Sequence, residues 1–228
     1  MENKKRILCA VLNEGSVSTR LSENLGVMKN NPDYEVTVQY FAEKPISYNR
    51  NTIVQKFLAE KYDYLMMIDD DTVPPPSVVN LADYDKDVVG ALYFMYQKTE
   101  IMPVAFDRAE EGLYQPIKID DKDGMVEVDA IGTGVIMIAR RVLEKIKAPF
   151  VNEYDADGIK LFGLDIAFCR KAKEQGFKIF VNLDYVCDHW QTANLRTFYT
   201  IIYSQRDLIN KQKEELKLLK GENKNENN

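Results

Sequence analysis

The stretch Tyr64-Leu-Met-Met-Ile-Asp-Asp-Asp-Thr-Val-Pro-Pro-Pro76 runs from an apolar segment of strand length into three carboxylates and then three prolines. Open α/β sheets carry their ligand sites at the carboxyl ends of the strands, which is where Asp69, Asp70 and Asp71 fall. Hard cations such as Mg²⁺ and Mn²⁺ take oxygen ligands and complete their coordination with water and substrate phosphate. The stretch therefore predicts a divalent-cation site that serves phosphate-bearing chemistry.

A simpler interpretation makes these carboxylates turn formers, or caps of the short helix that residues 77–81 suggest. That interpretation accounts for one aspartate. Three adjacent carboxylates repel one another unless a positive group neutralises them, which favours metal or phosphate chemistry.

Strands and helices alternate around this stretch. Apolar runs predict strands at 6–12, 35–40, 64–69 and 87–94. Helical periodicity predicts helices at 21–28 and 47–61 between them. This alternation indicates parallel βαβ units with right-handed crossovers, and the turn-rich segment from 96 to 129 indicates a small antiparallel addition. The expected fold is α/β, a doubly wound and mostly parallel central sheet with helices on both faces.

The second half of the chain adds a strand at 129–139 and a helix that Asp165 opens. Gly132 and Gly134 mark a bulge or leave room for a ligand against the backbone. Asp165 is either a helix cap or a functional carboxylate. The single histidine, His189, is either structural or a nitrogen ligand for a metal.

Composition bounds the class of protein. The length of 228 residues permits a single α/β domain, and 45% hydrophobic content is ordinary for a folded soluble protein. The net charge of -6 provides no global basic field for nucleic acid. Cys9, Cys169 and Cys187 are odd in number and widely spaced, which predicts reduced, buried thiols. No apolar run approaches the length of a spanning helix, so we expect a cytoplasmic protein, at most peripheral to a membrane.

In this order, over residues 6–190, these fragments resemble the GT-A-fold nucleotide-sugar glycosyltransferases, in particular the inverting family 2-like group. The segments that carry the resemblance are Leu12-Asn13-Glu14, Arg50-Asn51, Ile68-Asp-Asp-Asp71 as the DxD motif, Asp129-Ala-Ile-Gly-Thr-Gly134, Gly163-Leu-Asp165 and His189. One position departs from the family. Its usual Glu-Asp pair is Leu164-Asp165 here, which keeps the base position and loses the acidic neighbour.

The resemblance implies a metal-dependent transfer of a sugar from a nucleotide diphosphate sugar, a UDP-sugar by first choice, to the hydroxyl of a glycan, lipid-linked or other acceptor, with inversion. It implies Mn²⁺ or Mg²⁺ held by Asp69, Asp71 and His189. Asp165 would be the general base, with Asp155 and Asp157 as reserves. The donor-binding residues that it implies are Leu12, Asn13, Glu14, Arg50, Asn51, Asp69, Asp70, Gly132, Thr133 and Gly134.

Three alternatives remain open. Asp69-Asp-Asp-Thr-Val73 also satisfies the motif of haloacid-dehalogenase-like phosphatases, in which Asp69 would be a phosphorylated nucleophile, although that motif usually follows the first strand of its domain. A sugar-nucleotide pyrophosphorylase-like nucleotidyltransferase needs a glycine- and basic-rich phosphate loop, which residues 13–18 lack. A non-catalytic nucleotide-sugar-binding module would use the same fold.

We expect one catalytic domain over residues 1–200, with a donor-binding half at 1–95 and an acceptor half at 96–200. A C-terminal helix and a charged tail follow at 201–228, with disorder from Gly221 onward. The apolar and aromatic residues from Leu195 predict a helix that packs on the domain, pairs with a second subunit in a homodimer, or rests on a membrane surface.

Overall fold

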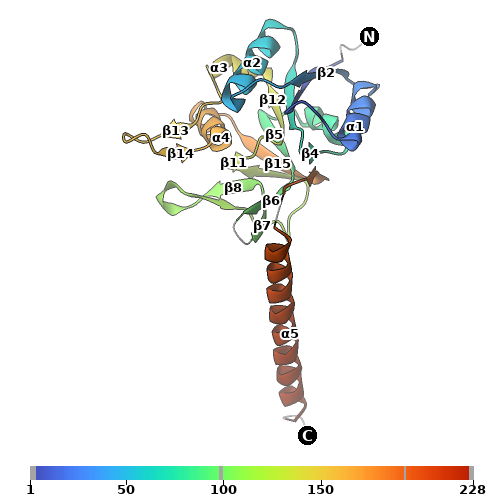
Figure 1. Cartoon of the computed structure of the whole chain (residues 1–228), viewed down its shortest axis with the longest axis vertical. Helices are drawn as coiled ribbons and strands as arrows, with labels where there is room; N and C mark the ends of the chain where they lie inside the picture. The colour runs from blue at the N-terminus through green and yellow to red at the C-terminus, as the bar shows by residue number, and fades with distance from the viewer. Residues whose placement is uncertain (1–3, 98–99, 193, 226–228) are drawn as a thin grey trace. The chain divides into compact units, whose positions relative to one another are not determined.

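The computed structural model describes residues 4–97, 100–192 and 194–225. The chain divides into two compact units, one of residues 1–95 and 101–190 and the other of residues 96–100 and 191–228. The first unit is built on a seven-stranded sheet with the order β10-β15-β5-β12-β3-β1-β2 (Figure 1). The prediction of an α/β, GT-A-like fold with a mostly parallel central sheet is confirmed.

The strands of the central sheet are β1 (Arg6–Leu12), β2 (Glu35–Phe41), β3 (Tyr64–Asp69), β5 (Val88–Leu92), β10 (Met125–Val128), β12 (Val135–Ala139) and β15 (Ile179–Val186). The short strands are β4 (Thr72–Val73), β6 (Phe94–Gln97), β7 (Glu100–Pro103), β8 (Ala105–Arg108), β9 (Tyr114–Pro116), β11 (Ala130–Ile131), β13 (Glu153–Tyr154), β14 (Lys160–Phe162) and β16 (Asp188–His189). The α-helices are α1 (Thr19–Lys29), α2 (Ile46–Ala59), α3 (Arg140–Lys145), α4 (Leu164–Glu174) and α5 (Leu195–Asn225), and the 3₁₀-helices are η1 (Pro76–Tyr84) and η2 (Glu110–Gly112).

Five of the seven central strands run in one direction. β1 pairs parallel with β2 and β3, and β15 pairs parallel with β5. β12 lies antiparallel between β3 and β5, and β10 lies antiparallel at the edge beside β15. β10 is the small antiparallel addition that the sequence predicted. The reversed β12 has the same apolar composition as its parallel neighbours, so composition does not reveal its direction.

Helices cover both faces of the sheet, as the fold prediction requires. Along β1, Leu8 and Ala10 face one core with side chains of α2, α3 and α4, whereas Ile7 and Cys9 face the other with side chains of α1 and η1. This alternation follows from the two-residue side-chain period of a strand that is buried on both faces. All three cysteines are buried and unpaired, as predicted.

The segment predicted as one strand over 129–139 is two strands. β11 pairs with β8 in a small three-stranded sheet, and β12 joins the central sheet. Between them the buried ring of Tyr93 lies against Gly132 and Gly134, and a Cβ added at Gly132 would approach the Tyr93 hydroxyl to 2.0 Å. The Gly134 N–H donates to that hydroxyl at 3.1 Å. Packing against Tyr93 therefore explains both glycines.

In the second unit, α5 continues to Asn225, whereas the sequence predicted disorder from Gly221. The charged segment 211–220 is rich in Lys, Glu and Leu, which are strong helix formers. Their helix propensity explains why the helix continues through this segment. Residues 226–228 lie outside the described residues. Among the described residues, no helix is long and apolar enough to cross a membrane.

Candidate active site

A buried arginine joins two carboxylates at the carboxyl end of β3. Arg50 lies on α2 with its side chain only 5% exposed, and its Nη2 donates to both oxygens of Asp69 at 2.9 Å. Its Nη1 donates to Asp165 Oδ1 at 3.1 Å. The Thr133 hydroxyl donates to the same Asp165 oxygen at 2.8 Å. The network thus unites four of the residues that the family resemblance implied.

Local structure explains why these side chains meet. Asp69 is the last residue of β3, beside Leu12 at the end of the parallel strand β1. Asp165 lies in the first turn of α4, but the N-cap is Gly163 and no side chain caps the helix. The side chain of Asp165 therefore does not cap the helix, and its hydrogen bonds are with Arg50 and Thr133. A carboxylate in a first turn still gains from the positive end of the helix dipole.

The three consecutive aspartates each have a different partner. Asp69 pairs with Arg50, Asp70 Oδ2 accepts from the Glu14 N–H at 3.0 Å, and Asp71 Oδ2 lies 3.5 Å from His189 Nε2. Burial raises the pKa of Asp69 to about 6, although Arg50 opposes this shift. The resemblance implied that Asp69 is a metal ligand. In this structure both of its oxygens accept hydrogen bonds from Arg50 instead.

Asp71 and His189 come together because β16 pairs with β4, with His189 opposite Thr72. The hydrogen bond to His189 lowers the pKa of Asp71, and the same interaction raises the pKa of His189. His189 Nδ1 lies 2.7 Å from the Phe94 carbonyl. If Nδ1 carries a proton, this bond orients the ring, and loss of the Nε2 proton that faces Asp71 would leave Nε2 as a lone-pair donor, the arrangement common to metal-binding histidines.

One carboxylate and one imidazole suit Mn²⁺ or Mg²⁺ when substrate and water supply the remaining ligands. Within the described residues, no group of three or more His, Cys, Asp or Glu side chains forms a metal site. The residues present therefore fit a cation that is held jointly by the protein and a phosphate-bearing ligand.

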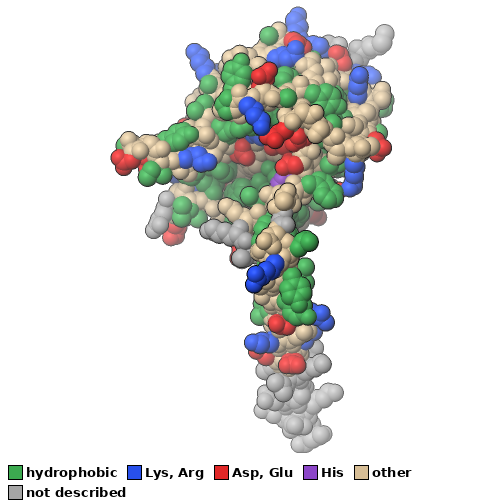
Figure 2. Space-filling view, viewed as in Figure 1, with side chains coloured by type: hydrophobic (Ala, Val, Ile, Leu, Met, Phe, Trp, Pro, Cys, Tyr) green, Lys and Arg blue, Asp and Glu red, His purple; other side chains and the backbone are tan. Residues whose placement is uncertain are grey.

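A cleft of about 650 Å³ opens at the same end of the sheet. Its lining includes five residues of the predicted donor site, namely Leu12, Asn13, Glu14, Asp69 and Asp70. Asp71 lines it as well, and Lys44 Nζ approaches Glu14 Oε1 to 2.7 Å at its edge. Figure 2 shows acidic side chains gathered on the visible face of this unit.

Asn51 supports the site indirectly. Its amide donates to the Phe150 carbonyl at 2.8 Å and accepts from the Phe150 N–H at 3.2 Å. The Phe150 ring lies 5.9 Å from the Arg50 guanidinium carbon, within cation–π range. Asn51 therefore positions the ring under Arg50, and its side-chain hydrogen bonds go to backbone groups outside the cleft.

Sequence reasoning missed Asn49, which lines the cleft and is 2% exposed. Its Nδ2 donates to the Phe41 carbonyl at 3.3 Å, and its Oδ1 is buried with no hydrogen-bond partner among the described residues. Unpaired buried acceptors are rare and costly. On the sequence, Asn49 looks like an ordinary polar residue near a helix start, and only its position beside Arg50 could have signalled it.

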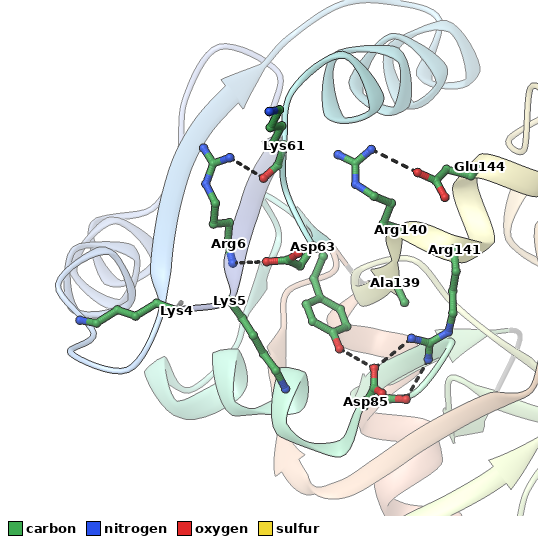
Figure 3. A pocket seen from close by; sticks show the side chains of 11 residues that line it. Lys4, Lys5, Arg6, Lys61, Asp63, Asp85, Ala139, Arg140, Arg141 and Glu144 are labelled. Carbon is green, nitrogen blue, oxygen red and sulfur yellow. Dashed lines mark hydrogen bonds and ion pairs between the residues drawn. The ribbon is translucent and has the colours of Figure 1, made fainter. Parts of the chain in front are cut away.

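A second cleft, of about 750 Å³, lies where β1 and β3 begin and is lined by six basic residues (Figure 3). Both arginines that begin α3 have internal partners. Arg140 donates to backbone carbonyls at the end of α2, including that of Phe57 at 3.0 Å, and Arg141 donates to Asp85 and Asp87. These contacts stabilise the helix end and the loop before β5, so this cleft has a structural role.

No protein-family model and no curated protein matches the chain. Among solved structures, A197 from STIV is 25% identical, with a TM-score of 0.57 over 82% of this chain and 86% of that one. GalNAc-T7 with UDP, GalNAc and Mn²⁺ is 14% identical, with a TM-score of 0.49 over 89% of this chain and 48% of that chain. A 4-diphosphocytidyl-2C-methyl-D-erythritol synthase from Anaerococcus prevotii is 10% identical, with a TM-score of 0.46 over 88% and 96%. The likeness to A197 supports the fold, whereas the other two structures are only loosely similar.

The Arg50→Met variant tests the network through its pH dependence. The pKa of Asp69, about 6 in the folded chain against an ordinary 3.8, means that its ionisation costs folding free energy as the pH rises through this window. Without Arg50 that ionisation costs more. We therefore expect a destabilisation of about 3 kcal/mol at pH 8 that shrinks toward pH 4.

Urea unfolding followed by circular dichroism at several pH values measures this loss. The control is Arg20→Met, which removes an exposed pair with Asp188 and should change the free energy of unfolding by less than about 1 kcal/mol at each pH. A loss for Arg50→Met that stays constant from pH 4 to 8 would contradict the electrostatic account.

Proposed function

We propose that this chain is a metal-dependent glycosyltransferase that moves a sugar from a nucleoside diphosphate sugar to an acceptor hydroxyl, with inversion at the anomeric carbon. The observation that carries the proposal is the Arg50 network, which holds the half-exposed carboxylate of Asp165 next to the aspartates at the end of β3. The family resemblance suggests UDP as the nucleotide, residues 1–95 as the donor-binding half and 96–200 as the acceptor half.

Asp71 and His189 would hold the cation, Mn²⁺ or Mg²⁺. A bound cation supplies positive charge where the leaving diphosphate becomes more negative as the glycosidic bond breaks. The hydrogen bond from His189 to the Phe94 carbonyl supports this role, because it limits rotation of the ring. Asp69, whose two oxygens accept from Arg50, would position that arginine and contribute negative charge nearby.

Asp165 would be the general base. Its Oδ1 accepts from Arg50 and Thr133, while its Oδ2 accepts no hydrogen bond from the described residues. The fixed oxygen orients the carboxylate, and Oδ2 remains to take the proton of the acceptor hydroxyl. As that proton moves to Oδ2, the acceptor oxygen forms its bond to the anomeric carbon and the bond from that carbon to the diphosphate breaks.

The nucleotide would occupy the cleft of about 650 Å³. Asn49 Oδ1 is a buried acceptor with no partner among the described residues, so a ligand N–H that reached it would relieve an existing cost. The imide N–H of uracil is such a donor, whereas the corresponding ring nitrogen of cytosine is an acceptor. Asn49 therefore favours a base with a ring N–H, such as uracil, over cytosine.

The geometry weakens the phosphatase alternative. A phosphorylated nucleophile needs a free carboxylate oxygen, but both oxygens of Asp69 accept from Arg50. Asp69 also ends β3 and not the first strand. The nucleotidyltransferase and the non-catalytic binding module remain alternatives, and the turnover assay with Asp165→Asn below distinguishes them from a glycosyltransferase.

The Asp165→Asn variant should bind UDP as tightly as the parent and lose about a thousandfold in sugar transfer, because the amide keeps the contact to Arg50 but takes no proton. Release of UDP from a panel of UDP-sugars with Mn²⁺ measures turnover, and titration calorimetry measures binding. The comparison variant is Asp157→Asn, at one of the two reserve candidates for the base, which should retain turnover. Turnover of Asp165→Asn within tenfold of the parent would contradict the assignment.

The Asn49→Ala variant should weaken UDP binding about tenfold, the effect of one hydrogen bond to a buried acceptor. Binding of CDP should change less, because cytosine presents no imide N–H. The matched control is Asn182→Ala, since Asn182 is also a buried amide with an unpaired atom but does not line the cleft. Equal losses of UDP and CDP affinity in Asn49→Ala would reject the uridine preference.

A further inference from the structure

The helix α5 carries a regular apolar stripe on its exposed surface. Leu195, Ile202, Ile209 and Leu216 recur at intervals of seven residues and are 84%, 60%, 49% and 53% exposed. Figure 2 shows hydrophobic side chains along the described part of this helix. Within the second unit, Phe198 packs on Tyr96 with ring centroids 5.2 Å apart, which covers only the start of the stripe.

The seven-residue interval indicates what covers the stripe. An α-helix turns every 3.6 residues, so a strict seven-residue repeat drifts by about 20° per heptad and follows a left-handed path. A second helix that supercoils around the first stays on such a path. Phe198, Gln205 and Gln212 stand three residues after successive members of the stripe, and they complete the two inward positions of a coiled coil.

We propose that α5 pairs with α5 of a second copy of this chain, in a parallel, in-register coiled coil. Gln205 and Gln212 support this arrangement. A glutamine amide both donates and accepts hydrogen bonds, so two identical glutamines satisfy each other when they face across the seam. They face each other only when the two helices are parallel and in register, as with other polar residues that set coiled-coil pairing.

The charges beside the seam favour the same orientation. Arg206 and Lys213 lie on one side of the stripe, and Ile201 and Leu208 lie on the other. In a parallel pair each basic side chain lies beside an apolar residue of the partner copy, where its methylene groups cover apolar surface and its charge reaches water. In an antiparallel pair the basic sides of the two helices would face each other and repel.

The same residues argue against a membrane surface as the occupant. Gln205, Arg206, Gln212 and Lys213 lie within or beside the stripe, so immersion of the stripe in lipid would also bury two amides and two charges. Interfacial helices instead keep their basic residues on the opposite, polar face. The proposal is independent of the proposed sugar transfer, because it uses no residue of that site.

The test is the molar mass of the full chain by light scattering after gel filtration, at loading concentrations from 1 to 200 µM. We expect twice the monomer mass at the upper concentrations. Ile209→Asp should raise the dimer dissociation constant at least a hundredfold, because it introduces a charge into the seam. Ser204→Asp adds the same charge on the far side of the helix and should leave the constant within threefold.

A cysteine at the seam tests orientation. Ile202→Cys should form an interchain disulfide under mild oxidation, because residue 202 faces residue 202 only in a parallel, in-register pair. The three native cysteines are buried and give the background in the parent chain. A dimer that fails to cross-link would overturn the parallel arrangement. A monomer at 200 µM would overturn the proposal, and binding of that monomer to phosphatidylserine vesicles, lost in Ile209→Asp, would assign the stripe to membranes.

Discussion

The buried guanidinium of Arg50 is the constraint on which the site depends. It joins Asp69 at the end of β3 to Asp165 at the start of α4, two carboxylates 96 positions apart in the chain. Without a cation between them these groups would repel across a partly buried space, and even with Arg50 in place burial raises the pKa of Asp69 to about 6. The arginine therefore links the first turn of α4 to the end of β3.

The three consecutive aspartates have different structural roles. Asp69 balances Arg50, Asp70 accepts from the backbone of the loop after β1, and Asp71 faces His189. Each carboxylate has a different neutralising partner, which explains how three can follow one another at a strand end. Of the three, only Asp71 combines half-exposure with a neighbouring imidazole, and this makes it the one best suited to share a cation with the diphosphate of the proposed donor.

The sequence predicted the layout of the fold well, because a strand buried on both faces and an amphipathic helix have different periods. It also predicted the location of the aspartates, since an apolar run that ends in carboxylates marks a strand end. Arg50 and Asp165 are 115 positions apart, so no local sequence pattern predicts their contact. Only the family resemblance suggested both residues. The role of Gly132 and Gly134 was ambiguous from the sequence, because the side chain that requires glycine at both positions is Tyr93, more than thirty residues away.

The central claim is that the Asp71–His189 pair binds a cation together with a nucleoside diphosphate. Titration calorimetry of UDP against the full chain, with and without Mn²⁺, tests it directly, and His189→Ala is the matched variant. The account predicts that Mn²⁺ strengthens UDP binding at least about tenfold in the parent, and that His189→Ala abolishes this gain while metal-free binding is unchanged. Binding of UDP that is indifferent to Mn²⁺, or an undiminished gain in His189→Ala, would contradict it.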